Sequence, residues 1–169
     1  MNQLMNVARR AIGGLSALRD LPPLLFRLIL AYGFWMPALT KWRNIDSTAK
    51  WFASMGYPFP ELNVYLSATT ELTGAILLTL GLATRLISVP LSVVMIVAIT
   101  TVHWKHGFAA GHNGFEIPLY YLVMLFSLIV GGAGRVSLDH QIARFFRARG
   151  EAVASSDGVG SRAAAPTDI

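Results

Sequence analysis

One carboxylate lies inside an otherwise apolar stretch of the chain. Glu71 falls within residues 62–83, where a charge surrounded by hydrocarbon is costly and is usually paired or functional. At about 1.5 Å per helical residue, Glu71 lies roughly 13 Å into its stretch, and Tyr32 of an earlier apolar stretch reaches the same depth. Trp35 and Tyr120 lie at or above this depth. We therefore expect a polar cavity with Glu71 near its floor, Tyr32 beside it and these two aromatic side chains as further ligand contacts. The alternative is a protonated Glu71 that only holds helices together by hydrogen bonding.

Arg27 is the second charged residue inside an apolar stretch. It lies roughly 9 Å from the start of residues 21–40, so its guanidinium can reach the membrane surface or bind backbone carbonyls. An axial gap of about 9 Å to Glu71 also leaves a direct ion pair open, although only with both side chains fully extended. Arg27 is therefore a candidate site residue whose partner the sequence leaves undecided.

Three histidines and a glutamate follow one another between two apolar stretches. His103 and His106 are three residues apart and share one face of a helix end, and His112 and Glu116 come next. Imidazole and carboxylate together suit Zn, Cu, Ni or Fe, so these four side chains could form a metal site. They could equally pass protons between a ligand and the surface, or only bind loop carbonyls. The chain has no cysteine, which excludes thiol chemistry and iron–sulfur ligation by its own residues.

The composition indicates the kind of fold that must position these side chains. The 169 residues are 54% hydrophobic and only 14% charged, whereas a soluble domain carries about 25% charged residues. A water-soluble enzyme and a disordered chain are therefore excluded. We predict an all-α protein, a four-helix transmembrane bundle with a short amphipathic C-terminal helix. A further interfacial helix is expected around residues 47–55, in an aromatic connection.

The expected parts of the chain follow from these stretches. They are a cytoplasmic N-terminal segment (1–20), a membrane domain (21–134), an amphipathic interfacial helix that Ser137 caps (135–149) and a disordered tail (150–169). The four spans within the membrane domain are residues 21–40, 62–83, 86–102 and 117–133.

The basic residues predict the orientation in the membrane. With four spans, both termini lie on one side. That side holds nine basic residues, namely Arg9, Arg10, Arg19, Arg85, Arg135, Arg144, Arg147, Arg149 and Arg162. The other side holds four, namely Lys41, Arg43, Lys50 and Lys105. Because cytoplasmic flanks are rich in Lys and Arg, both termini are predicted to be cytoplasmic. The net charge of +5 is then an orientation signal, so the expected partner is the lipid bilayer and not nucleic acid.

Three segments resemble a known family when they are taken in order. Residues 71–86 read ELTGAILLTLGLATRL, residues 106–116 read HGFAAGHNGFE, and residues 131–139 read GGAGRVSLD. Together with Arg27 and Lys41, they resemble the DoxX family of small four-helix bacterial membrane proteins.

The resemblance implies a multi-pass protein of the bacterial inner membrane that works with a protein partner in a membrane complex. The family is named for a relative of the membrane subunit of an archaeal thiosulfate–quinone oxidoreductase. Other members are placed with oxidative-stress complexes or with clusters that make metal-binding modified peptides. The family pattern carries over only to Arg27, Glu71, His106 and Glu116.

These observations lead to one main hypothesis and two alternatives. The main hypothesis is a redox-associated, quinone-linked subunit with an outward-open pocket, at most the membrane subunit of an oxidoreductase complex. In it, Glu71 exchanges a proton, Tyr32 orients the ligand, and His103 and His106 relay protons to the surface. The first alternative is a non-enzymatic scaffold or accessory protein for a metal-handling or modified-peptide system. A small-solute transporter ranks lower, because the chain shows no internal repeat. A quinone and a metal ion both stay open as cofactors.

Overall fold

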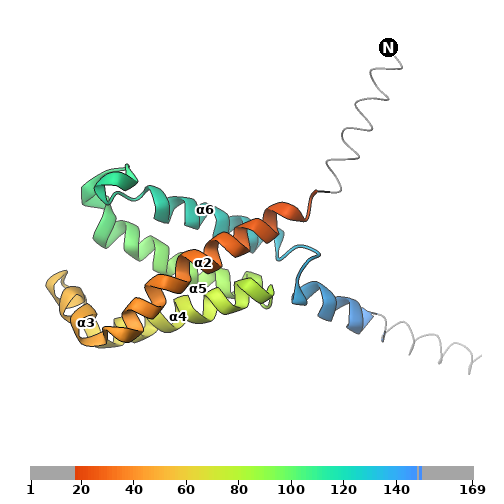
Figure 1. Cartoon of the computed structure of the whole chain (residues 1–169), viewed down its shortest axis with the longest axis horizontal. Coiled ribbons are helices and arrows are strands. Elements are labelled where there is room, and N and C mark those ends of the chain that lie inside the picture. Colours follow the sequence, from red (N-terminus) through yellow and green to blue (C-terminus); the bar gives the residue numbers. More distant parts are fainter. Residues whose placement is uncertain (1–17, 148, 150–169) are drawn as a thin grey trace, which may run out of the picture.

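A computed structural model describes residues 18–147 and 149, and within this part of the chain every regular element is a helix. The all-α expectation is therefore confirmed for the described residues. The elements are α2 (Leu21–Arg43), α3 (Ile45–Ser54), α4 (Pro60–Leu80), α5 (Thr84–Ala98), the π-helix η1 (Ile99–His103), the 3-10 helices η2 (Trp104–His106) and η3 (Ala110–His112), and α6 (Glu116–Gly131) (Figure 1). A further helix covers residues 138–147. The expected tail and nearly all of the expected N-terminal segment lie outside the described residues.

Two of the helices are long and apolar enough to cross a membrane. They are Leu21–Arg43 and the continuous helical segment Thr84–His106, which joins α5 to η1 and η2. The apolar helix α6 is shorter, at 16 residues, and α4 carries several polar side chains along its 21 residues. The structure thus supports two of the four predicted spans by length and hydropathy.

The connection between α4 and α5 is contacted by two side chains that are far from it in the sequence, Arg27 and Asp139. Gly81 follows the last residue of α4 with a left-handed φ of 67°, and a Cβ there would lie 2.7 Å from the Arg27 guanidinium carbon. Glycine therefore serves both the turn and the close approach. The Asp139 carboxylate accepts hydrogen bonds from the N–H groups of Ala83 (2.7 Å) and Thr84 (3.0 Å), which caps the start of α5. The connection thus lies at residues 81–83, between the end of α4 and the start of α5.

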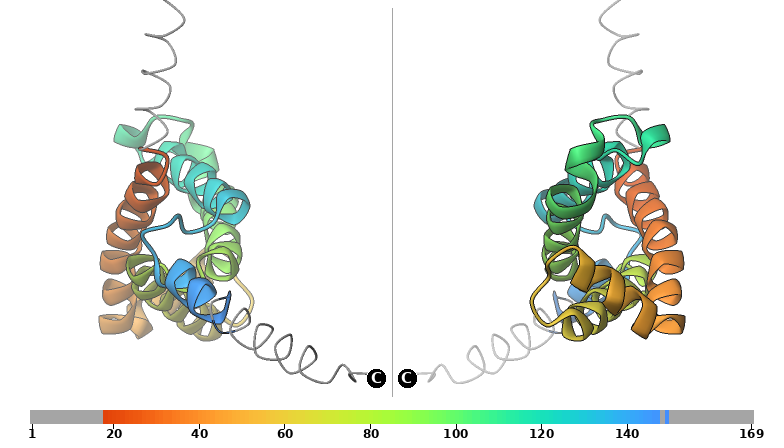
Figure 2. Two further views of the ribbon diagram at one scale, coloured as in Figure 1. Left: turned by 90° about the vertical axis from the view of Figure 1, so that its right-hand side faces the viewer. Right: turned by 90° about the vertical axis from the view of Figure 1, so that its left-hand side faces the viewer.

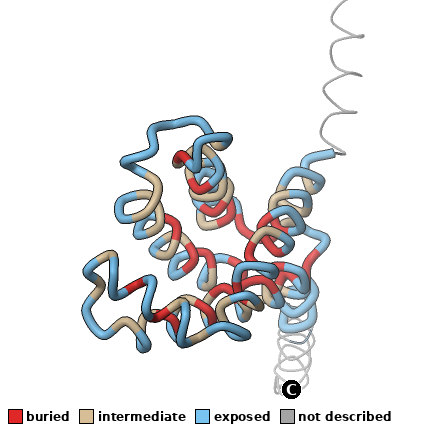
Figure 3. Tube along the Cα trace, turned by 60° about the vertical axis from the view of Figure 1, so that its left-hand side comes forward, coloured by how far each residue is buried: buried red, intermediate tan, exposed pale blue. Residues whose placement is uncertain are grey.

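The core is formed where four helices face one another. α2 packs on α4 and α5 packs on α6, while α4 adjoins α5 and α2 adjoins α6. Figure 3 shows the buried stretches on the helix sides that face inward. The main buried cluster takes residues from all four helices: Leu30, Ala31, Phe34, Ala75, Leu78, Leu91, Met95, Leu125 and Leu128. Many large apolar side chains point outward instead, as hydrocarbon surroundings would favour.

The two ends of this helical assembly are built differently (Figures 1 and 2). At one end lie α3 and the segment 99–115, and α3 packs against α4 through Ala49, Phe52 and Val64. At the other end lies the segment 132–147. Its helix starts after Ser137, whose hydroxyl accepts a hydrogen bond from the His140 N–H (3.2 Å), so the predicted cap is confirmed.

Candidate functional site

The buried carboxylate of Glu71 is paired with the ammonium group of Lys41. Glu71 lies on α4 and is 2% exposed. Lys41 comes from the last turn of α2, and its Nζ donates to Glu71 Oε1 (2.5 Å) and Oε2 (2.6 Å). One cation thus neutralises both oxygens of a carboxylate that few other polar groups can reach. Because donor and acceptor are both ionised, these hydrogen bonds are stronger than bonds between neutral groups.

Sequence reasoning missed Lys41 as the partner, for a geometric reason. The predicted first span ends at residue 40, which places Lys41 among the charges of the outer connection. In the structure α2 continues to Arg43 and α4 already begins at Pro60. A lysine at this helix end can therefore fold its flexible side chain back toward the carboxylate. The sequence does contain a signal for such a partner, because a carboxylate buried in a span needs a nearby cation or a proton.

A cavity of about 330 Å³ is lined by both residues of this ion pair and by Trp51 and Phe52 of α3. Its volume is at the lower end of the range for small-molecule sites, roughly 300–1,000 Å³. Its charged or polar lining side chains include Lys41, Glu71, Ser67 and His103. Most of the other lining groups are apolar or aromatic, including Phe34, Trp51, Phe52, Tyr57, Val94, Met95, Ile117 and Tyr121. An apolar wall with few polar groups is typical of a ligand site.

Three aromatic residues expected at the cavity do not line it. Tyr32 is 78% exposed, and Trp35 and Tyr120 also face outward. Counting residues along a helix gives depth, but the side that a residue faces depends on its angle around the axis. Tyr32 is two positions, about 200°, away from Phe34, which does line the cavity.

Tyr121, Tyr57 and Trp51 stand where those aromatic residues were expected. Tyr121 reaches across to α2 because position 33 is a glycine, and a Cβ on Gly33 would overlap the Tyr121 hydroxyl. Spacing along the chain does not distinguish between neighbouring aromatic residues such as Tyr120 and Tyr121.

Arg27 is buried away from this cavity and binds backbone carbonyls. Its Nε donates to Leu78 O (2.9 Å), and Nη1 donates to Ala133 O (2.8 Å) and Val136 O (2.7 Å). A longer bond runs from Nη2 to Thr79 O (3.3 Å). Of the partners that the sequence leaves open for Arg27, the structure shows backbone carbonyls and no ion pair with Glu71. Arg27 joins the end of α4 to the segment 132–136, so its role in the structure is to hold helices together.

The histidine segment does not gather its four candidate metal ligands. Among the described residues, no three His, Asp or Glu side chains lie close enough together to hold a metal ion. The side chains bind groups of their own segment: His103 Nδ1 lies 2.8 Å from Asn113 O, His106 Nδ1 lies 3.0 Å from Val102 O, and Glu116 accepts from the Ala110 N–H (2.9 Å) and the Tyr120 hydroxyl (3.0 Å). Of the four candidates, only His103 lines the cavity, and His106, His112 and Glu116 do not.

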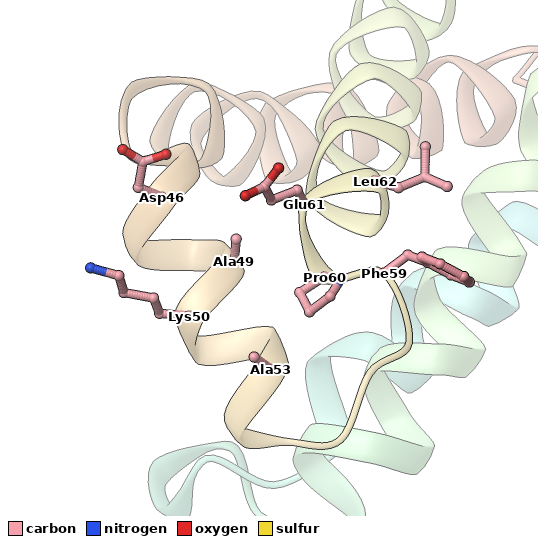
Figure 4. Close-up of a pocket in the computed structure, with 8 residues that line it drawn as sticks. All are labelled: Asp46, Ala49, Lys50, Ala53, Phe59, Pro60, Glu61 and Leu62. Atoms are coloured by element: carbon pink, nitrogen blue, oxygen red, sulfur yellow. The ribbon is translucent and has the colours of Figure 1, made fainter.

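A second hollow lies outside the helical core, between α3 and the start of α4 (Figure 4). It measures about 630 Å³ and shares no lining residue with the cavity of Glu71. Its apolar lining residues are Ala49, Ala53, Phe59, Pro60 and Leu62. The Lys50 side chain points away from the hollow in Figure 4. Its charged residues take part in neither of the ion pairs found among the described residues. We therefore place the candidate site at Lys41 and Glu71.

Fold and site together define a class of protein: an all-α chain with two helices apolar enough to cross a membrane and a buried acid–base pair in a ligand-sized cavity. The chain belongs to the DoxX family, a family of membrane-associated proteins. The DoxX family model matches residues 23–104, which include both Lys41 and Glu71.

Two curated relatives extend the match beyond this range. A Haemophilus influenzae protein described as uncharacterized is 33% identical over 131 residues, which are 73% of this chain and 84% of the relative. A Bacillus subtilis protein named "Putative oxidoreductase CatD" is 34% identical over 122 residues, which are 71% of this chain and 86% of the relative. No solved structure matches the chain significantly.

Proposed function

We propose that this DoxX protein is a quinone-linked, redox-associated subunit of the bacterial inner membrane. It would be at most the membrane subunit of an oxidoreductase complex, with electrons supplied or taken by a protein partner. The observation that carries the proposal is the Lys41–Glu71 pair, buried in a cavity whose remaining walls are largely apolar and aromatic. The name of the Bacillus subtilis relative points to the same class of chemistry.

The proposal places α2, α4, α5 and α6 side by side in the bilayer, with both termini in the cytoplasm. Although α4 and α6 do not reach the length and hydropathy of the other two helices, each packs against them. Both also present large apolar side chains outward, including Leu66 on α4 and Phe126 on α6. If α4 and α6 lay outside the bilayer, these apolar surfaces would be exposed to water, which is unfavourable. The cavity and α3 then face outward from the cell.

The residues of the cavity fit a quinone ring. A bound quinone would supply two carbonyl oxygens that take up electrons and protons. The Lys41 ammonium is a donor that can bind such an oxygen, and Glu71 can hold or release a proton beside it. His103 supplies an imidazole to the lining and lies at the beginning of the surface segment. We assign it the transfer of protons toward the outer surface.

Intrinsic fluorescence provides a direct binding test, because Trp51 lines the cavity. Replacing Trp35, Trp42 and Trp104 with Phe leaves Trp51 as the single reporter, since the chain has four tryptophans. The purified protein in detergent is then titrated with duroquinone, a fully substituted quinone ring without a tail. We expect saturable quenching that Glu71→Gln and Lys41→Met each weaken about tenfold, the loss of one charged hydrogen bond.

Glu61→Gln is the matched control. It makes the same substitution on the same helix but at an exposed residue outside the cavity, so its binding curve should not change. Equal quenching by all variants, or none by the parent protein, would overturn the proposal. A protein that binds no quinone but retains a partner during purification would favour the scaffold hypothesis.

A further inference from the structure

Another cavity, of about 310 Å³, adjoins the one that is lined by Lys41 and Glu71 and is separate from the hollow of Figure 4. It lies between α4 and α5, which run side by side in Figure 1. The two cavities share five lining residues: Phe52, Tyr57, Ser67, Val94 and Val97. They are therefore adjoining hollows that share one wall. We call them the ion-pair cavity and the seam cavity.

The seam cavity differs from the ion-pair cavity in its chemistry. It has no charged lining residue, and Leu66, Pro90, Val93, Val94 and Val97 supply most of its wall. Its amide and one of its hydroxyls are engaged with backbone carbonyls, since Asn63 donates to Pro58 O (2.5 Å) and Ser67 to Val64 O (3.1 Å). The seam cavity thus suits hydrocarbon and offers little to a polar ligand.

The seam cavity also opens to the outside of the helical assembly. Leu66 on α4 and Val93 on α5 both line the seam cavity, yet they are 56% and 55% exposed. In the proposed membrane arrangement this exposed seam meets the lipid chains. A molecule dissolved in the bilayer could therefore reach the ion-pair cavity from the side.

Two stacked rings form part of the boundary between the cavities. Phe52 and Tyr57 line both, with ring centroids 4.8 Å apart and an interplanar angle of 19°. The Tyr57 hydroxyl is also hydrogen-bonded to the Thr101 hydroxyl at 2.5 Å, which ties the connection after α3 to η1. Ser67, Val94 and Val97 complete the lining that the two cavities share.

We infer that the seam cavity binds the hydrocarbon tail of a lipid-soluble ligand whose polar head lies at Lys41 and Glu71. The inference rests on the proposed function and adds a binding site for a second part of the ligand. Because about 330 Å³ is room for roughly one ring system, a long tail must leave the ion-pair cavity. The seam cavity is the adjoining apolar route, and burying the tail there removes hydrocarbon from contact with water at the outer surface.

Single-cysteine protection separates the two parts of the ligand, since the chain has no cysteine of its own. Val93→Cys reports on the seam cavity alone and Val102→Cys on the ion-pair cavity alone. Val123→Cys on α6 lines neither cavity and is the control. The full-length variants are labelled with a maleimide in detergent, with decylubiquinone, with duroquinone or without ligand. Leu66→Cys is a second seam reporter if labelling at position 93 is slow.

At a ligand concentration of about ten times Kd, mass action slows labelling of an occluded thiol about tenfold. We expect both quinones to protect Cys at position 102 and only the tailed quinone to protect it at positions 93 and 66. Position 123 should react equally in all samples.

Protection at position 102 without any at positions 93 and 66 would overturn the inference and leave the proposed function standing. Equal protection of position 93 by the tailless quinone would also overturn it, because the head would then lie in the seam. No protection at position 102 by either quinone would contradict the proposed function itself.

Discussion

The Lys41–Glu71 ion pair should appear as a strong energetic coupling between the two residues. Glu71 is almost fully buried, whereas the Lys41 side chain is 18% exposed, so the two single substitutions are not equivalent. Lys41→Met leaves a carboxylate in an apolar cavity without its cation, which costs about 3–5 kcal/mol of the free energy of unfolding. Glu71→Gln leaves an ammonium that can turn toward solvent, and we expect a loss of about 1–3 kcal/mol.

The double variant Lys41→Met/Glu71→Gln removes both charges and should lose less than the sum of the single losses. A coupling of about 2–3 kcal/mol is expected for two groups in direct contact. The measurement is reversible unfolding of the four purified proteins in mixed micelles, followed by circular dichroism.

Lys50 and Glu61 provide the matched control cycle, because they lie near the same end of the molecule and form no ion pair with each other. Their Met and Gln substitutions should add within about 0.5 kcal/mol. If the Lys41 and Glu71 substitutions were also additive within that margin, the pair would not be the energetic centre of the site.

Three further substitutions test the positions that hold the helices around the cavity. Arg27→Lys should lower the free energy of unfolding by about 3 kcal/mol, since one ammonium cannot replace the forked bonds to several carbonyls. Arg43→Lys on the exposed end of α2 should change it by less than about 0.5 kcal/mol, and equal effects would refute the assigned role of Arg27. Gly74→Ala places a Cβ 2.7 Å from Leu91 Cδ1 and should cost about 1–3 kcal/mol, whereas a gain would show that the two helices can separate freely. Asp139→Ala removes the cap from the start of α5 and should cost about 1–2 kcal/mol in the same unfolding assay, and an unchanged midpoint would speak against that contact.

The sequence predicted the helical elements well because apolar stretches in a chain this poor in charge leave few other folds. The four predicted spans correspond to α2, α4, α5 with η1, and α6, with ends that shift by a few residues. The short helix expected around residues 47–55 is α3, at Ile45–Ser54. Length and hydropathy identify two of these four elements as spans, because α4 carries several polar side chains and α6 is shorter.

The site was predicted only in part, and the reason lies in side-chain direction. Glu71 could be found from the sequence, because a carboxylate in an apolar stretch is conspicuous wherever it points. Its partner Lys41 and the lining residue Tyr121 depend on the rotation of the helices about their axes and on the room that Gly33 leaves. Spacing along the chain does not determine these features once helices pack in three dimensions.

Photoaffinity labelling tests the central claim most directly. The probe is a quinone that carries a diazirine on its ring, and the sites of crosslinking in the full-length protein are mapped by mass spectrometry. The account predicts crosslinks on α2 and α4 around Lys41 and Glu71 and on α3 around Trp51, all reduced by excess duroquinone and by Glu71→Gln. Crosslinks confined to the opposite end of the molecule, at residues 132–147, or labelling that excess duroquinone does not reduce, would contradict it.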